Sequence, residues 1–407
     1  MDEHPEAREI VETLARAGFV AYYAGGWVRD FLLGHPSDDI DIATNAPPET
    51  IQALFPRTVP LGIAFGIVLV LIGKRQYEIA TFRQDFDYID GRRPSRVEFT
   101  TAQEDAKRRD FTINGMFYDP LTGKVIDYVD GKADLERRLI RAIGDPHERI
   151  REDRLRMMRA LRLSCRFGFA IEAKTEQAIR AHAQELMPAV AIERVVQELE
   201  KARGGGKLRE LLVLLHEFGL LGSIFPVLRE VALEEVKANL VQYPAATPLI
   251  GWLMALFSRQ TADDIVALTQ RLKLATLEQQ FGIFLLQARA RFTRNAEAWE
   301  WAHFYAHRFS ELCLDIHAAH LDADSRRDFL IEHAKRKNAL KRAIERIQTR
   351  RPLIASSDLA AAGIPASPAM GALLKEAERI AINEQIEEKA ALLARLKNSP
   401  AWPHTGD

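Results

Sequence analysis

The spacing of apolar and polar residues divides the chain into a mixed first part and a helical remainder. Apolar residues recur every three or four positions over 5–18, which predicts an amphipathic helix. Short apolar or alternating runs at 19–26, 37–44 and 66–83 predict strands. From about residue 133 the strand signals stop and helical spacing continues. We therefore expect an α+β domain on a small mixed or antiparallel sheet, followed by an all-α region.

Breaks in this pattern suggest further division. The segment 83–96 has no periodicity and is rich in charge, Gly and Pro, so we expect a loop there. The stretch "RGGGK" (203–207) reads as a linker, and the segment 350–368 as a boundary before a last helical region. The predicted domains are a head (1–140), a neck (141–203), a body (204–351) and a tail (352–407).

Two carboxylates occupy alternate positions in the stretch "HPSDDIDIATNAP" (35–47). Along a strand, residues i and i+2 face the same side, so Asp39 and Asp41 would project together while Ile40 and Ile42 point into the core. Like charges at that distance repel unless a cation lies between them. Mg²⁺ prefers one or two carboxylates together with substrate phosphates. The pair therefore predicts a Mg²⁺ site, although a surface turn is the alternative for such a pair alone.

A glycine turn lies just upstream, in "GGWVRD" (25–30). Gly25 and Gly26 let the backbone approach a ligand closely, and the start of the following helix offers free amides to an anion. Arg29, one helical turn further along, would reach the same anion, for example a phosphate group. A tight turn with a surface Arg–Asp pair is the alternative interpretation. Together with the carboxylate pair, the turn indicates a triphosphate–metal site.

Three ordered motifs carry a resemblance to a known family: "GGWVRDFLLGHPSDDIDIATNA" (25–46), "RRDFTINGMFYDPLTGKVIDYVDGKADL" (108–135) and "DPHERIREDRLRMMRALRLSCRFGF" (145–169). They resemble the class II tRNA nucleotidyltransferase and bacterial poly(A) polymerase family, within the polymerase-β-like nucleotidyltransferases. The resemblance implies addition of CCA to tRNA 3′ ends from CTP and ATP, without a nucleic-acid template. It also implies that Arg109 contacts the nucleotide and that Asp110 and Asn114 order the helix or the ribose.

In a two-metal displacement one ion activates the attacking hydroxyl and the other stabilises the leaving pyrophosphate. Asp39 and Asp41 are expected to hold both ions. Glu78, in the alternating strand "QYEIATFR", is a candidate third carboxylate. An exposed strand residue is the alternative interpretation of Glu78.

The segment "EDRLRMMRALR" (152–162) suggests how a protein selects a base. Residues three apart are neighbours on a helix, so Asp153, Arg156, Arg159 and Arg162 would form one polar row; a salt-bridged surface is the alternative. Cytosine and adenine both present an amino donor beside a ring acceptor, and uracil and guanine reverse this order. Because a carboxylate accepts and a guanidinium donates, Asp153 with Arg156 matches C and A. Arg159 and Arg162 remain for the triphosphate.

The product stays open at this point: CCA, A alone or poly(A). The segment 356–396 resembles the tail of bacterial CCA-adding enzymes, and the 83–96 segment with Arg92 and Arg93 is typical of full CCA addition. A non-catalytic RNA-binding protein is disfavoured because the motif residues are intact.

Composition places the chain among ordinary globular proteins, with 47% hydrophobic and 28% charged residues and a formal net charge of −1. Two basic stripes, 137–166 and 326–351, each carry ten Lys and Arg, and such local stripes can bind phosphate backbones, although solvated helix faces are the alternative. The second stripe is expected to contact the acceptor and T stems of tRNA. No apolar run is long enough for a membrane span, and the acidic start resembles no signal peptide. Two cysteines favour a reducing cytoplasm, and no protein partner is evident.

Overall fold

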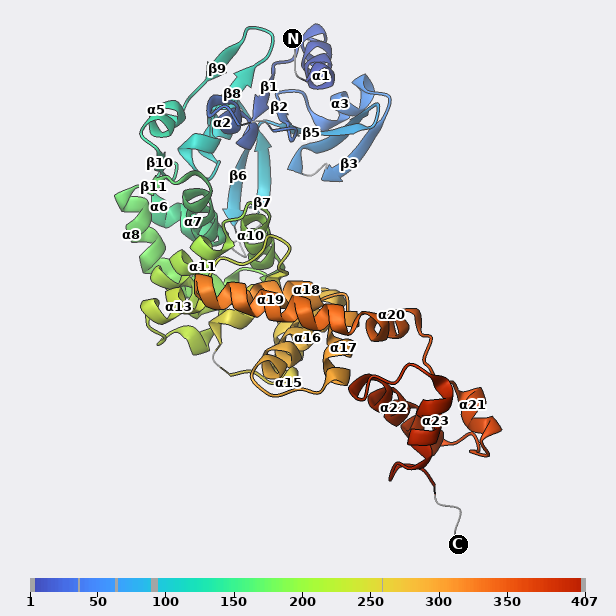
Figure 1. Cartoon of the computed structure of the whole chain (residues 1–407). Coiled ribbons are helices and arrows are strands. Elements are labelled where there is room, and N and C mark those ends of the chain that lie inside the picture. Colours follow the sequence, from blue (N-terminus) through green and yellow to red (C-terminus); the bar gives the residue numbers. More distant parts are fainter. Residues whose placement is uncertain (1–3, 36, 63–64, 89–93, 258, 404–407) are drawn as a thin grey trace. The chain divides into compact units, whose positions relative to one another are not determined.

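The computed structural model describes residues 4–35, 37–62, 65–88, 94–257 and 259–403. It forms two compact units, Met1–Lys237 and Ala238–Asp407 (Figure 1). The predicted head, neck, body and tail are a finer division, and they stay a prediction.

The first unit contains the predicted sheet. Seven strands lie in the order β3-β4-β5-β2-β1-β8-β9. The pair β2–β5 is parallel and the other pairs are antiparallel, so the sheet is mixed, as expected. The strands are β1 Ala21–Ala24, β2 Asp41–Thr44, β3 Thr58–Gly62, β4 Ile67–Ile72, β5 Arg75–Thr81, β8 Phe117–Asp119 and β9 Lys124–Ile126.

Two helices of this region follow from simple sequence signals. Helix α1, Pro5–Arg16, buries Ile10, Val11 and Leu14 on the apolar stripe that its spacing predicts. Proline occupies the first turn of α3, where its missing N–H costs nothing. The remaining short helices of the sheet region are α2 Gly26–Leu32, α3 Pro48–Leu54, α4 Ala102–Lys107 and α5 Gly131–Glu136.

The prediction of a loop over 83–96 is wrong for those residues of the segment that the structure describes. Strands β6, Arg83–Tyr88, and β7, Pro94–Phe99, form a separate antiparallel hairpin (Figure 1). A two-stranded ribbon outside the main sheet needs no buried face, so its sequence needs no alternation of apolar residues. Arg92 and Arg93 lie outside the described residues.

A helical region follows the sheet within the first unit. The expected single helix over 152–162 is wrong, because α6 ends at Glu152, α7 begins at Leu155, and Asp153 lies between them in an extended conformation. The "RGGGK" stretch comprises the last two residues of α10 and a turn that leads into α11, which packs against α10. The elements are α6 Pro146–Glu152, α7 Leu155–Phe167, α8 Ala173–His182, α9 Leu186–Ala189, α10 Ile192–Gly204, α11 Leu208–Glu217, α12 Leu220–Ile224 and α13 Leu233–Asn239, with a small two-stranded pair, β10 Leu139–Ile140 and β11 Ala170–Ile171.

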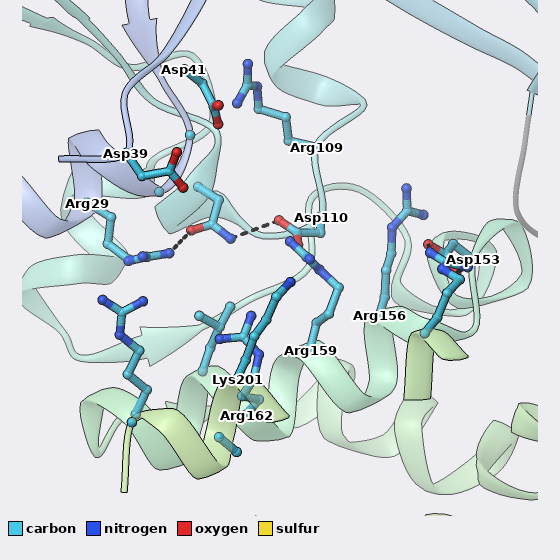
Figure 2. A pocket seen from close by; sticks show the side chains of 18 of the residues that line it. Arg29, Asp39, Asp41, Arg109, Asp110, Asp153, Arg156, Arg159, Arg162 and Lys201 are labelled. Carbon is cyan, nitrogen blue, oxygen red and sulfur yellow. Dashed lines mark hydrogen bonds and ion pairs between the residues drawn. The ribbon is translucent and has the colours of Figure 1, made fainter. Parts of the chain in front are cut away.

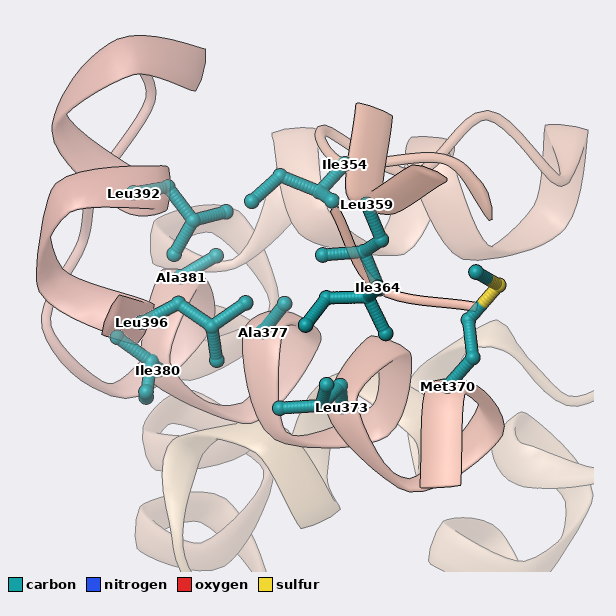
Figure 3. Packing of buried hydrophobic residues seen from close by; sticks show 10 residues of the cluster. All are labelled: Ile354, Leu359, Ile364, Met370, Leu373, Ala377, Ile380, Ala381, Leu392 and Leu396. Atoms are coloured by element: carbon teal, nitrogen blue, oxygen red, sulfur yellow. The ribbon is translucent and has the colours of Figure 1, made fainter. Parts of the chain in front are cut away.

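The regular elements that the structure describes in the second unit are all helices, as expected. Near its end, Leu359, Leu373, Ile380 and Leu396 meet in one apolar cluster (Figure 3). None of the helices that the structure describes is both long and apolar enough to cross a membrane. The helices are α14 Leu249–Leu253, α15 Ala262–Arg271, α16 Thr276–Phe292, α17 Ala298–Ala306, α18 Ser310–Ala318, α19 Ala323–Ala339, α20 Lys341–Thr349, α21 Ser356–Ala361, α22 Pro368–Asn383 and α23 Lys389–Lys397.

Candidate active site

One large cavity of about 840 Å³ lies within the first unit. Eleven Lys and Arg side chains line it against four Asp side chains, so its field favours a polyanion. Figure 2 shows the acidic pair on one side of the cavity and arginines projecting from α7 on another. Glu78 is not among the lining residues. The predicted residues that line the cavity are Gly25, Gly26, Arg29, Asp39, Asp41, Arg109, Asp153, Arg156, Arg159 and Arg162.

The acidic side of the cavity combines two neighbouring strands. Asp41 is the first residue of β2, and Asp39 precedes the strand rather than belonging to it. The parallel register that pairs Ile42 with Ile79 places Asp41 beside Glu78 on β5. Ile40 and Ile42 are buried, as the alternation predicts. The three carboxylates therefore share one region, although Glu78 does not reach the cavity wall.

This crowding changes how the carboxylates ionise. Burial by surrounding protein, and then the charges of Glu78 and Asp39, raise the pKa of Asp41 to about 6. Burial and the charge of Asp39 also raise the pKa of Glu78. A divalent cation would relieve this repulsion, and oxygen donors are the ligands that Mg²⁺ takes. Asp39 and Asp41 fit such an ion, whereas no cluster of three or more metal-ligating side chains occurs within the described ranges.

The glycine turn lies against the acidic pair. Gly25 has a φ of +68°, which favours glycine, and Ala24 before it pairs with Asp41 across β1 and β2. A Cβ at Gly25 would lie 3.2 Å from Nη1 of Arg109 and 3.5 Å from Oδ2 of Asp41. A side chain at position 25 would therefore enter the space between the guanidinium of Arg109 and the carboxylate of Asp41.

Arg29 is more enclosed than expected. It is 4% exposed, and it forms an ion pair of 2.8 Å with Asp30, so the alternative of a surface Arg–Asp pair is wrong. Its Nη1 donates to Oδ1 of Asn114, and its guanidinium lies 4.7 Å from the ring centroid of Phe167. Burial lowers the pKa of Arg29. Arg29 is held in place from several sides at the cavity wall.

Asp110 is the centre of a hydrogen-bond network between the sheet region and α7. Asn114 donates to its Oδ1 at 3.0 Å, and Arg159 donates from Nε to its Oδ2 at 2.7 Å. Burial alone would raise the pKa of Asp110, but Arg159 and the Asn114 hydrogen bond hold it well below its usual range. Arg29, Asn114, Asp110 and Arg159 thus form one continuous chain of polar contacts.

A buried acid on α10 pairs with two arginines of α7, Arg159 and Arg162. Glu198 is 2% exposed and accepts from Nε of Arg162, with Lys201 at 3.3 Å. Burial favours its neutral form, yet Arg162 and Arg159 lower its pKa. Neither Glu198 nor Lys201 was predicted from the sequence. The i, i+3 spacing of Glu198 and Lys201 was the only feature of the sequence that pointed to this ion pair, and such pairs are common on exposed helices.

Asp153 and Arg156 also have partners that were not predicted from the sequence. Asp153 accepts two hydrogen bonds from Arg194, at 3.0 and 2.7 Å. Arg156 donates to Glu152 at 2.7 Å and to the carbonyl of Arg149. Asp153 and Arg156 therefore line the same cavity without belonging to one helical row. No spacing rule connects Asp153 with Arg194, because 41 positions separate them.

Comparison with known proteins gives consistent results. The family model of the poly(A) polymerase head domain matches residues 21–141, and a model described as a probable RNA and SrmB-binding site of polymerase A matches 168–231. A CCA-adding enzyme of Levilactobacillus brevis is 36% identical over 97% of both chains. That of Geobacillus stearothermophilus is 45% identical, but the match spans about half of each protein, 53%.

Solved structures agree with the same fold. The crystal structure of the Bacillus stearothermophilus CCA-adding enzyme in complex with CTP superposes with a TM-score of 0.79 at 30% identity, covering 97% of this chain and 98% of that one. The Thermotoga maritima CCA-adding enzyme complexed with tRNA superposes with a TM-score of 0.67 over 96% of this chain and 93% of that one. At 19% identity, the second match supports the fold alone.

Proposed function

The chain belongs to the family of CCA-adding enzymes, and we propose on this basis that it adds C, C and A in turn to the 3′ end of tRNA. The substrates are CTP and ATP, no nucleic-acid template is used, and pyrophosphate is released. The observation that carries the proposal is one basic cavity that holds both a metal-type carboxylate pair and the Asp153–Arg156 pair. The relative that superposes best among those described was solved with CTP.

Asp39 and Asp41 are the proposed ligands of Mg²⁺, with Glu78 as a third carboxylate behind them. Bound divalent ions would lower the pKa of the attacking hydroxyl and neutralise the leaving pyrophosphate. The chain's own contribution is positioning. Arg29 and Arg109 border the glycine turn, and Arg159 and Arg162 project from α7 toward the space that a triphosphate would fill. The arginines bring cationic donors to the phosphate oxygens, and their ion pairs hold them before the substrate enters.

Base selection is proposed to rest on hydrogen-bond direction. The carboxylate of Asp153, held by Arg194, accepts from the amino group of C or A, and Arg156 donates to the adjacent ring nitrogen. One pair of side chains would thereby serve both bases. We propose that the β6–β7 hairpin moves between C and A addition, since its base lies beside the cavity at Arg83.

Incorporation assays test the proposed product directly. We expect the protein to add CC and then A to a tRNA that ends at the discriminator base, and A alone to a tRNA that ends in CC. Addition of A only to the second substrate would identify an A-adding enzyme. Long A tails on an unrelated RNA would identify a poly(A) polymerase. No incorporation on any substrate would contradict the proposal.

The basic stripe of the second unit is proposed to contact the tRNA backbone at the acceptor and T stems. Part of its charge is already compensated, because Arg336 pairs with Glu332, Lys337 with Glu311 and Arg342 with Glu387. Lys335 and Lys341 are exposed on α19 and α20.

Both free thiols, Cys165 and Cys313, suit the reducing cytoplasm, where we propose that the enzyme acts.

Charge reversal at Lys335 and Lys341 is expected to weaken tRNA binding and make it less salt-dependent. Each lost phosphate contact should reduce the slope of log K against log salt by about one. Filter binding at several salt concentrations measures the slope. The affinity for CTP should stay unchanged, because both lysines lie in the second unit and the cavity lies in the first. An unaltered slope would exclude this stripe from the interface.

A further inference from the structure

A buried carboxylate beneath the cavity contacts both Arg109 and the hairpin base. Asp105, on α4, is 1% exposed and does not line the cavity. Its Oδ2 accepts from Arg109, from Nε at 3.2 Å and Nη2 at 3.0 Å. Its Oδ1 accepts from Nε of Arg108 at 2.8 Å and from the backbone N–H of Arg83 at 3.2 Å. One side chain therefore joins three cavity-lining residues.

The contact with Arg109 determines where that guanidinium points. Asp105 holds the edge formed by Nε and Nη2, so Nη1 is directed away from it. A Cβ at Gly25 would lie 3.2 Å from this Nη1, which places the nitrogen at the glycine turn beside Asp41 (Figure 2). The aromatic ring of Phe117, with its centroid 5.0 Å from the guanidinium carbon, supports the same orientation.

The contact between Asp105 and the backbone of Arg83 connects Arg109, through Asp105, to the β6–β7 hairpin. Arg83 is the first residue of β6 and pairs with Phe99, the last residue of β7. Its side chain also donates to the carbonyl of Phe65. The hairpin thus leaves the domain at a point where Asp105 and the backbone both hold it.

Asp105 can hold these cationic and N–H partners because it is ionised. Burial by itself would raise its pKa, but the charges of Arg109 and Arg108 lower it below the usual value. A buried carboxylate with two arginines and a backbone donor has little freedom to move. Its partners are consequently fixed relative to one another.

We propose that Asp105 is a positioning residue that aims Arg109 at the bound triphosphate. The proposal rests on the proposed function, since it takes Arg109 as a nucleotide contact. It predicts that a change at Asp105 acts on nucleotide use through Arg109. A residue with only a structural role would lower activity in every background alike.

A double-mutant cycle tests this coupling. We expect Asp105→Asn to lower kcat/KM for CTP and ATP by about 10- to 100-fold, mainly through KM, and to weaken CTP binding in the absence of tRNA. Arg109→Ala should cost at least as much. In the Arg109→Ala background, Asp105→Asn should cost no more than about twofold. Equal losses in both backgrounds would overturn the proposal.

Asp134→Asn is the matched control. Asp134 is also 1% exposed and also pairs with an arginine, Arg141, but neither residue lines the cavity. Its effect on kcat/KM should be the same with and without Arg109.

A second variant covers the case in which Asp105→Asn does not fold. Arg109→Lys keeps the charge but cannot offer two nitrogens along one edge, so it should show the loss expected for Asp105→Asn. Wild-type kinetics for Arg109→Lys would also overturn the proposal. The test is separate from that of the proposed function, which fails only if the wild-type protein itself adds no nucleotide.

Discussion

Replacement of Asp39 or Asp41 by Ala is expected to lower nucleotide incorporation by about a thousandfold or more. Divalent ions at such a site contribute several kcal/mol to the stability of the transition state, and each 1.4 kcal/mol corresponds to about a factor of ten in rate. Asp41 and Asp39 are the carboxylates that line the cavity beside the glycine turn. Single-turnover assays with CTP over a range of Mg²⁺ concentrations measure the loss. Near-normal turnover of either variant would exclude the two-metal assignment.

A neighbouring acid supplies the control for this loss. Asp38→Ala removes an exposed carboxylate one position away that does not line the cavity, so it should change incorporation little. A comparable loss in this variant would indicate a general electrostatic effect rather than a metal site.

The Ala variants should leave the fold intact, and removal of the Asp41 charge should stabilise it. Because the pKa of Asp41 is raised to about 6 in the folded state, its ionisation destabilises the metal-free fold as the pH rises from about 4 through 6. Asp41→Asn should therefore have a higher Tm than the wild type at pH 8 without Mg²⁺. The difference should disappear at pH 3, where Asp41 is protonated in both the folded and the unfolded state. Added Mg²⁺ should raise the Tm of the wild type and not that of Asp41→Asn.

Asp153→Asn is expected to reduce the preference for CTP and ATP over UTP and GTP by about tenfold or more. The wild-type carboxylate can only accept, so it faces the carbonyl oxygen of uracil or guanine as acceptor against acceptor. Each unpaired buried polar group costs about 1–3 kcal/mol, and two mismatches supply about a hundredfold discrimination or more. An amide adds a donor at this position and removes one mismatch. Competition assays with mixed nucleotides measure the ratio.

Two control variants separate base reading from general damage. Arg194→Gln removes the donor that holds Asp153, and it should lower the use of CTP and ATP without admitting UTP. Asp145→Asn changes an acid that caps α6 outside the cavity, and it should leave the preference unchanged. If Asp153→Asn keeps the wild-type preference, this residue does not read the base.

The order of elements and the principal candidate residues could be predicted from the sequence. Helix α1 and strands β4 and β5 lie where the spacing of apolar residues places them, because burial of one face is a local and periodic property. The glycine turn and the two aspartates were identifiable for a similar reason. Their chemistry depends on residues that are close neighbours in the chain, at 25–41.

Tertiary structure alone decided which charges meet. Arg29 binds Asn114, 85 positions away, and Asp153 binds Arg194. Glu198 pairs with Arg162 of α7 and Lys201 of α10. It also decided that Asp153 lies in a break between helices and that β6 and β7 form a hairpin with Asp105 beneath its base. Such pairs depend on distances between separate elements, which close packing sets and no sequence period encodes. The sequence determined which chemical groups are present, and the packing of the elements determined how each is held.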